Sequence, residues 1–150
     1  MTCQDNEILL NGVLIQMARS FLQYVSESSP WVANNAASDE SQVIVLAARQ
    51  RQDVAEIVWL LDQREHFIDF GTFPTEYTDQ QFLSLQSEMG GLKRSLEGVC
   101  NRIGNSIVSL RTAGDAEAAD LLTTIESHER DILRCLGEIE KTLANHSPAV

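Results

Sequence analysis

Few side chains in this 150-residue sequence have the spacing that chemistry requires. A di-iron site inside a bundle of four helices needs an inward Glu from each of two helices and Glu-x-x-His from each of the other two, because two iron ions require several carboxylates and imidazoles around them. Glu129 has a suitable inward position, but Ile132 stands where that motif requires His. The stretch from Leu10 to Tyr24 has no acidic residue on its inward face. We therefore expect no metal and no cofactor.

The histidines and cysteines also lack partners in the expected register. The three histidines fall at different heights along the expected bundle, which argues against a shared metal site; they are His66, His128 and His146. Cys100 and Cys135 lie about eight residues out of step in the last hairpin, or ~12 Å along a helix, whereas a disulfide needs Cα atoms within about 7 Å. No Cys–His pair supports thiol catalysis.

An odd number of cysteines without a CxxC motif predicts reduced thiols and a cytoplasmic protein. Whether the protein is an enzyme stays open, and a non-catalytic role is favoured.

Two inward charges are expected to meet in the core. Arg51 and Glu129 both fall near mid-height, where related bundles place metal. An unpaired buried charge is very costly, so charges of opposite sign should pair. We predict that Arg51 approaches Glu129 and occupies the volume of a lost site. The alternative is that Arg51 extends outward while Glu129 is half exposed.

These residues must be positioned by helices. Four proline-free stretches have helical periodicity, at roughly 5–28, 39–68, 79–112 and 116–145, and they predict an all-α, single-domain four-helix bundle over residues 1–150. Residues with capping chemistry stand at the expected ends, namely Asp39, Thr78, Gly114 and Asp115.

The connection between the second and third helices decides the topology. Asp69 to Tyr77 could extend roughly 30 Å, whereas a helix of this length spans roughly 40 Å. A crossover along the bundle is therefore possible but tight, and a plain up-down-up-down bundle is the alternative.

Two segments indicate a family. Tyr24–Trp31 reads YVSESSPW and Phe70–Asp79 reads FGTFPTEYTD. They resemble the Y…E…PW and GxFPxxYT elements of an uncharacterised bacterial family of ferritin-like helical bundles. In that family the first element closes the first helix and the second leads into the third. The resemblance covers most of the chain, implies the ferritin-like crossover topology and carries no activity.

The remaining unusual residues allow two interpretations each. Phe67, Phe70, Phe73 and Tyr77 surround the connection, where they either line a ligand pocket or, as we favour, pin the connection to the bundle. Gly90, Gly91, Gly98 and Gly104 lie off the seam of the third helix and mark either a close approach or a kink.

Composition and apolar patterning limit the partners. The net charge of −11 disfavours nucleic acid and anionic membranes. We expect no apolar run to approach the ~20 residues of a membrane span, and the N-terminus lacks the basic region of a signal peptide. Outward apolar residues on the first two helices predict a two-fold homodimer through both helices; they are Ile8, Ile15, Leu22, Val45 and Trp59. The alternative is that the N-terminal residues or the connection cover this face within one chain.

The sequence therefore favours a non-catalytic ferritin-like bundle without metal, acting as a homo-oligomeric structural or interaction module. A metal-binding or redox protein with a non-standard site is the first alternative. A helical chaperone or regulator of another protein is the second.

Overall fold

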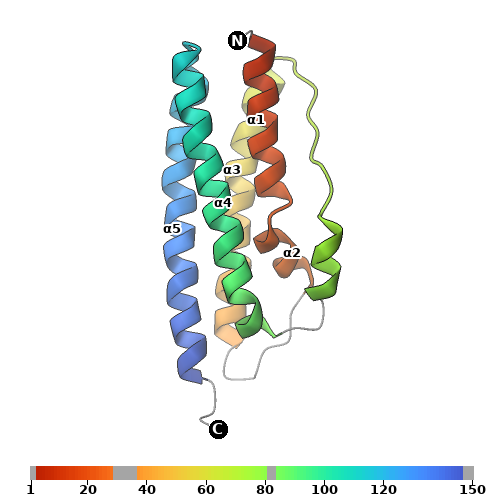
Figure 1. Ribbon diagram of the computed structural model, residues 1–150, viewed down its shortest axis with the longest axis vertical. Helices are drawn as coiled ribbons and strands as arrows, with labels where there is room; N and C mark the ends of the chain where they lie inside the picture. The colour runs from red at the N-terminus through yellow and green to blue at the C-terminus, as the bar shows by residue number, and fades with distance from the viewer. Residues whose placement is uncertain (1–2, 29–36, 81–83, 147–150) are drawn as a thin grey trace.

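The computed structural model describes residues 3–28, 37–80 and 84–146, and it confirms an all-α bundle of four helices. The main helices are α1 (Cys3–Ala18), α3 (Ala37–Gln63), α4 (Leu85–Thr112) and α5 (Ala116–His146) (Figure 1). A short helix, α2 (Phe21–Ser28), follows α1 at a different inclination (Figure 1), and a 3-10 helix, η2 (Thr75–Gln80), precedes α4.

The directions of the helices follow from contacts at their ends. Arg64, directly after α3, forms ion pairs with Glu7 near the start of α1 and with Asp115 between α4 and α5. These ends therefore meet at one end of the bundle. Consequently α3 and α4 run in the same direction, and α1 and α5 run in the opposite one (Figure 1). Residues 64–74, which we call the strap, run along the outside of the bundle from α3 to η2 (Figure 1).

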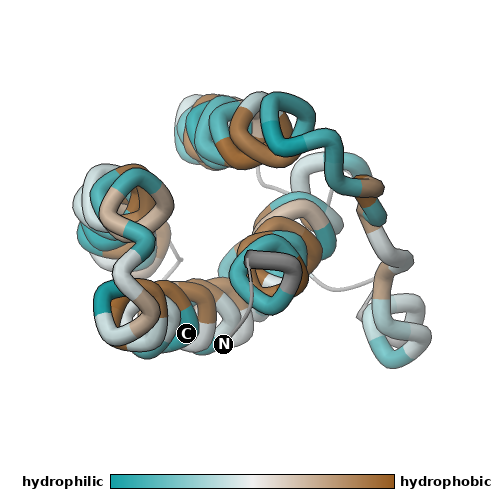
Figure 2. The backbone as a smooth tube through the Cα atoms, turned by 90° about the horizontal axis from the view of Figure 1, so that it is seen from above, coloured by the Kyte–Doolittle hydropathy of each residue, from teal (hydrophilic) through white to brown (hydrophobic). Residues whose placement is uncertain are grey.

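The predicted seam of α4 forms part of the core, but the predicted seam of α3 is wrong at Ile44 and Arg51, which are exposed. On α4, buried apolar residues follow steps of three and four, a spacing that keeps them on one face of a helix; they include Leu85, Met89, Leu92, Leu96, Val99 and Ile103. Ser106 is the one polar interruption of this α4 seam, and it is buried. Figure 2 views the helices from above, arranged around the shared interior.

The helix predicted over 5–28 is interrupted at Arg19 and Ser20. The Ser20 hydroxyl donates to Gln50 Oε1 on α3 at 2.8 Å and accepts from the Gln23 N–H at 3.5 Å, in the manner of an N-cap for α2. The break therefore depends on a partner on another helix, and no Gly or Pro marks it.

Two other predicted boundaries are also wrong. Helix α3 ends at Gln63 rather than near 68, and Glu65 follows it with a φ of 54°. Helix α4 begins at Leu85 rather than 79, because Ser84 caps it by accepting from the Ser87 N–H at 3.2 Å. Thr78, the predicted cap, lies instead in η2.

The α4–α5 turn agrees with prediction. Gly114 adopts a φ of 77°, a conformation that favours glycine. Asp115 Oδ1 accepts from the Ala118 N–H at 3.1 Å, which makes Asp115 the N-cap of α5.

One apolar stretch is longer than the sequence analysis expected. Asp5–Ser28, which covers α1 and α2, is long and apolar enough to cross a membrane by length and composition alone. Its most apolar window is 56% buried within the bundle, and the core helix of a soluble protein passes the same test.

Candidate functional site

A network of polar side chains fills the middle of the core. Glu129 on α5 and Gln50 on α3 are both completely buried, and the Gln50 amide donates to Glu129 Oε1 at 2.7 Å. Gln50 Oε1 in turn accepts from the Ser20 hydroxyl and, at 2.9 Å, from the Gln23 amide. Gln23 also donates to the Ala47 carbonyl at 2.8 Å. The α1–α2 break is thus joined through α3 to α5.

Asp53 extends this network to the surface. It is 4% exposed, and its Oδ1 lies 2.8 Å from Nδ1 of His128, whose side chain is 53% exposed. Burial, together with the neighbouring Asp53 carboxyl, raises the pKa of Glu129 to about 9. Glu129 is therefore protonated at neutral pH. Glu129 Oε2 and Asp53 Oδ2 are both buried, and neither has a hydrogen-bond partner among the described residues.

The predicted ion pair between Arg51 and Glu129 is not formed. Arg51 is exposed, and it donates to Gln23 Oε1 at 2.9 Å, so two glutamines separate it from Glu129. The prediction assumed that Glu129 is charged, but in the folded protein it is a neutral acid that requires a hydrogen-bonding partner rather than a cation.

This network does not provide a metal centre. Within residues 3–28, 37–80 and 84–146, no group of three or more His, Cys, Asp or Glu side chains is arranged to hold a metal ion. Cys100 and Cys135 are free thiols, and burial raises the pKa of Cys100 to about 11, which disfavours the reactive thiolate.

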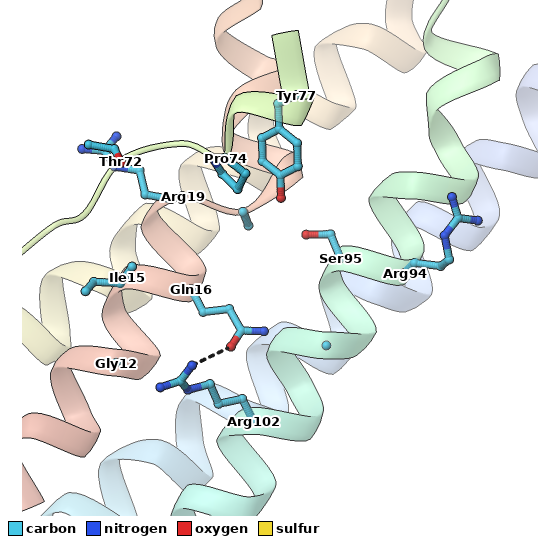
Figure 3. A pocket seen from close by; sticks show the side chains of 12 residues that line it. Gly12, Ile15, Gln16, Arg19, Thr72, Pro74, Tyr77, Arg94, Ser95 and Arg102 are labelled. Atoms are coloured by element: carbon cyan, nitrogen blue, oxygen red, sulfur yellow. Dashed lines mark hydrogen bonds between the residues drawn. The ribbon is translucent and has the colours of Figure 1, made fainter. Parts of the chain in front are cut away.

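A second polar site, absent from the sequence predictions, lies on the outside of the bundle. It is a groove of about 470 Å³ between α1, the strap with η2, and α4 (Figure 3). We call it the arginine groove, because its lining includes Arg19, Arg94 and Arg102 and no acidic residue. Gln16, Tyr77 and Ser95 add polar atoms. In Figure 3 the hydroxyl groups of Tyr77 and Ser95 point toward each other across the groove.

These three arginines differ from most others in the protein. Five arginines form ion pairs with carboxylates within 3.3 Å, namely Arg49, Arg64, Arg111, Arg130 and Arg134. In the part of the chain that the structure describes, none of the arginines that line the groove forms such a pair. Arg19 donates through Nε to the Phe70 and Gly71 carbonyls at 3.1 Å, and Arg102 donates to Gln16 at 3.4 Å. Three guanidinium groups therefore keep donors free of carboxylates in a protein of net charge −11.

Glycines make room around the groove. A Cβ atom on Gly12 would overlap the Arg102 guanidinium, and one on Gly98 would lie 3.4 Å from the Gln16 amide nitrogen. On Gly91 a Cβ would lie 3.0 Å from the Phe21 ring. Gly91 thus permits the close approach of Phe21, which is the first of the two interpretations that the sequence left open, whereas Gly90 faces only Arg94 of its own helix. In the sequence, the spacing of four residues from Arg94 to Gly98 and from Gly98 to Arg102 was the feature that could have indicated the side of α4 that lines the groove.

Two of the four aromatic residues that the sequence analysis singled out hold the strap and η2 against the bundle. Phe73 and Tyr77 pack on Tyr24 with ring centroids 5.4 Å apart, and Tyr77 lies 5.0 Å from Phe21. The strap and η2 are therefore held against α2. The other two aromatics, Phe67 and Phe70, are 81% and 44% exposed.

The predicted dimer face is only partly exposed. Ile8, Val45 and Trp59 are exposed by 56%, 58% and 59%. Leu22, however, is buried in the core. Ile15 is half buried beside Gly71 of the strap, as the alternative of an intramolecular cover expected. The exposed residues therefore concentrate on α3.

Comparison with known proteins adds no assignment, because no protein-family model matches the sequence and no curated protein is detectably similar to it.

Proposed function

We propose that this protein is a non-catalytic helical interaction module that works as a homodimer, with α3 of one copy packed against α3 of a second. The observation that carries the proposal is an uncharged stripe on α3, which is exposed at Val45, Gln52, Ala55 and Trp59 and half-buried at Ala48; we call it the α3 stripe. Its steps of three and four are those of a helix–helix seam. A solvated helix face normally carries charged residues instead.

The α3 stripe is self-complementary when two copies run antiparallel. Val45 and Trp59 lie seven residues before and after Gln52, so a two-fold axis at Gln52 places each Val45 opposite a Trp59 of the second copy. Trp is enriched at the centres of interfaces because it buries a large apolar area. The same pairing would cover the shallow apolar groove beside Val45, which Leu46, Cys135 and Ile139 line.

Charges beside the stripe support this register. Arg49, which also pairs with Asp131 of its own copy, lies three residues before Gln52. Glu56 lies four residues after Gln52, so the antiparallel pairing places Arg49 and Glu56 at nearly the same height on opposite copies. Glu56 is exposed, and it has no ion pair among the described residues. Rim charges of this kind set register more than they add affinity.

We also propose that the bundle is related to the ferritin-like folds. Support comes from the parallel course of α3 and α4, because one long crossover connection is typical of those folds. The buried Gln50 and Glu129 lie at mid-height, where such bundles carry their metal ligands. An experimental structure that placed α3 and α4 antiparallel would exclude this relation.

Molar mass in solution tests the dimer. At micromolar concentration we expect about twice the monomer mass of 16.7 kDa. Trp59→Glu should give monomers, because a charge would have to be buried at the contact. Val108→Glu is the matched control, since Val108 is an exposed apolar residue (67%) on α4, and this variant should stay dimeric. A monomeric wild-type protein, or a Trp59→Glu variant that remains dimeric, would exclude the proposed interface.

A further inference from the structure

We propose that the arginine groove binds a small, elongated anion that carries at least two phosphate or carboxylate groups. This inference is independent of the proposed dimer, because the α3 stripe contributes no residue to the lining of the groove. Its basis is the collection of arginines without carboxylate partners in one concave surface of an otherwise acidic protein.

The arginines are suited to this role by their chemistry. A guanidinium group presents several donors in a plane, and it binds carboxylate or phosphate through two parallel hydrogen bonds. Arg19 donates through Nε to the strap carbonyls, and its Cζ lies 5.0 Å from the centroid of the Phe73 ring, so its terminal nitrogens are the donors that stay available. Arg94 forms no hydrogen bond within the described part of the chain, and its head lies over Gly90 of its own helix. Since the Debye length is about 8 Å at physiological salt, a bound anion would experience these charges more than the distant net charge.

The length of the ligand follows from the spacing of the arginines. Arg94 and Arg102 are eight residues apart on α4, which corresponds to ~12 Å along the helix. In Figure 3 the head of Arg102 lies beside Gln16, whereas the head of Arg94 points away from Ser95 and Tyr77. A ligand with an anionic group at each end spans this separation, and this favours it over a single phosphate group. The groove volume of about 470 Å³ falls within the range typical of small-ligand sites.

Neutral groups between the arginines complete the site. The Tyr77 and Ser95 hydroxyls lie at the middle of the groove (Figure 3), and Ile15 and Pro74 provide apolar surface. Ser95 is held in place because its Oγ accepts from the Phe21 N–H at 3.1 Å. The exposed arginine heads can rotate toward a ligand, since side-chain rearrangement on binding is common.

Calorimetric titration of the full chain at about 50 mM salt tests the inference with inorganic tripolyphosphate, citrate and inorganic phosphate. We expect tripolyphosphate or citrate to bind at least tenfold more tightly than inorganic phosphate. The tighter of the two identifies the ligand as a phosphate or a carboxylate. Arg94→Gln and Arg102→Gln should each weaken binding about tenfold, which is the loss of about 1.4 kcal/mol.

Arg130→Gln is the control, because Arg130 lies on α5 outside the groove and pairs with Glu126; its affinity should stay within about twofold of wild type. Trp59→Glu should also bind normally, which separates this inference from the dimer. The inference fails if neither polyanion binds, if inorganic phosphate binds as tightly as they do, or if Arg130→Gln weakens binding as much as Arg94→Gln. Circular dichroism of each variant confirms that it is folded.

Discussion

The carboxyl group of Glu129 is uncharged in the folded protein at neutral pH, because burial, together with the neighbouring Asp53 carboxyl, raises its pKa to about 9. A neutral acid can be replaced by an amide at small cost, whereas its removal leaves the buried Gln50 amide without an acceptor. We therefore expect Glu129→Gln to change the free energy of unfolding at pH 6 by less than about 1 kcal/mol. Glu129→Leu should lower it by ~1–3 kcal/mol, the cost of an unsatisfied buried polar group.

The same residue makes the stability pH-dependent. The folded pKa of Glu129, about 9, lies above its unfolded value of 4.5, so the folded state binds the extra proton between these values. Stability from this group is complete below pH 4.5 and is lost as the pH rises toward 9, by up to about 1.4 kcal/mol per pH unit. Urea unfolding from pH 5 to 9 should show this slope in wild type and a flatter one in Glu129→Gln.

Glu88 provides the matched control for that slope. It is also buried, and burial raises its pKa only to about 7. Glu88→Gln should therefore remove slope below about pH 7 and leave the decline above it. If Glu129→Gln keeps the full decline between pH 7 and 9, then Glu129 is not the group that carries the proton.

The glycines of α4 act at the scale of the element. Glycine costs a helix about 1 kcal/mol relative to alanine. At Gly90 a Cβ would meet only the flexible head of Arg94, at 3.3 Å. At Gly91 it would lie 3.0 Å from the ring of Phe21, which is 6% exposed and packed against Tyr77. We expect Gly90→Ala to raise the free energy of unfolding by up to about 1 kcal/mol.

Gly91→Ala should lack this gain or lower stability, because the Phe21 ring cannot move without disturbing its neighbours. Urea unfolding of the two single variants measures the difference. Equal stabilisation by both alanines would show that α2 is not packed tightly on α4 at this point.

The elements also show which features can be predicted from the sequence. The seam of α4 and the caps at Gly114 and Asp115 were predicted correctly, because periodicity and capping are properties of neighbouring residues. The break before α2 was missed, since Ser20 is stabilised there by Gln50 on another helix. The arginine groove was missed for the same reason: Arg19 and Arg102 are distant in sequence and share a surface only because α1 packs against α4.

At the scale of the whole molecule, Arg64 joins the ends of three helices. It donates to both carboxylate oxygens of Asp115, at 2.7 and 2.9 Å, and also contacts Glu7 and Glu117. Its side chain is 19% exposed, and those of Glu7 and Asp115 are 10% and 11% exposed. Without Arg64, three carboxylates would crowd together, two of them mostly buried. Such a charge left unpaired is strongly destabilising.

We therefore expect Arg64→Met to lower the free energy of unfolding at pH 7 by roughly 2 kcal/mol, a value reduced from that of a fully buried pair because the site is partly solvated. Arg111→Met is the control. Arg111 pairs with Asp120, and their side chains are 50% and 71% exposed, so the loss of free energy of unfolding should stay below about 0.5 kcal/mol.

The hydrogen bonds from Arg64 hold the pKa of Asp115 below its ordinary value of 3.8. Stability from this contact is therefore present above pH 3.8 and is lost as the pH falls below it. The gap between wild type and Arg64→Met should narrow below about pH 4, and a gap that is constant down to pH 2 would assign the effect to packing of the Arg64 stem rather than to its charge.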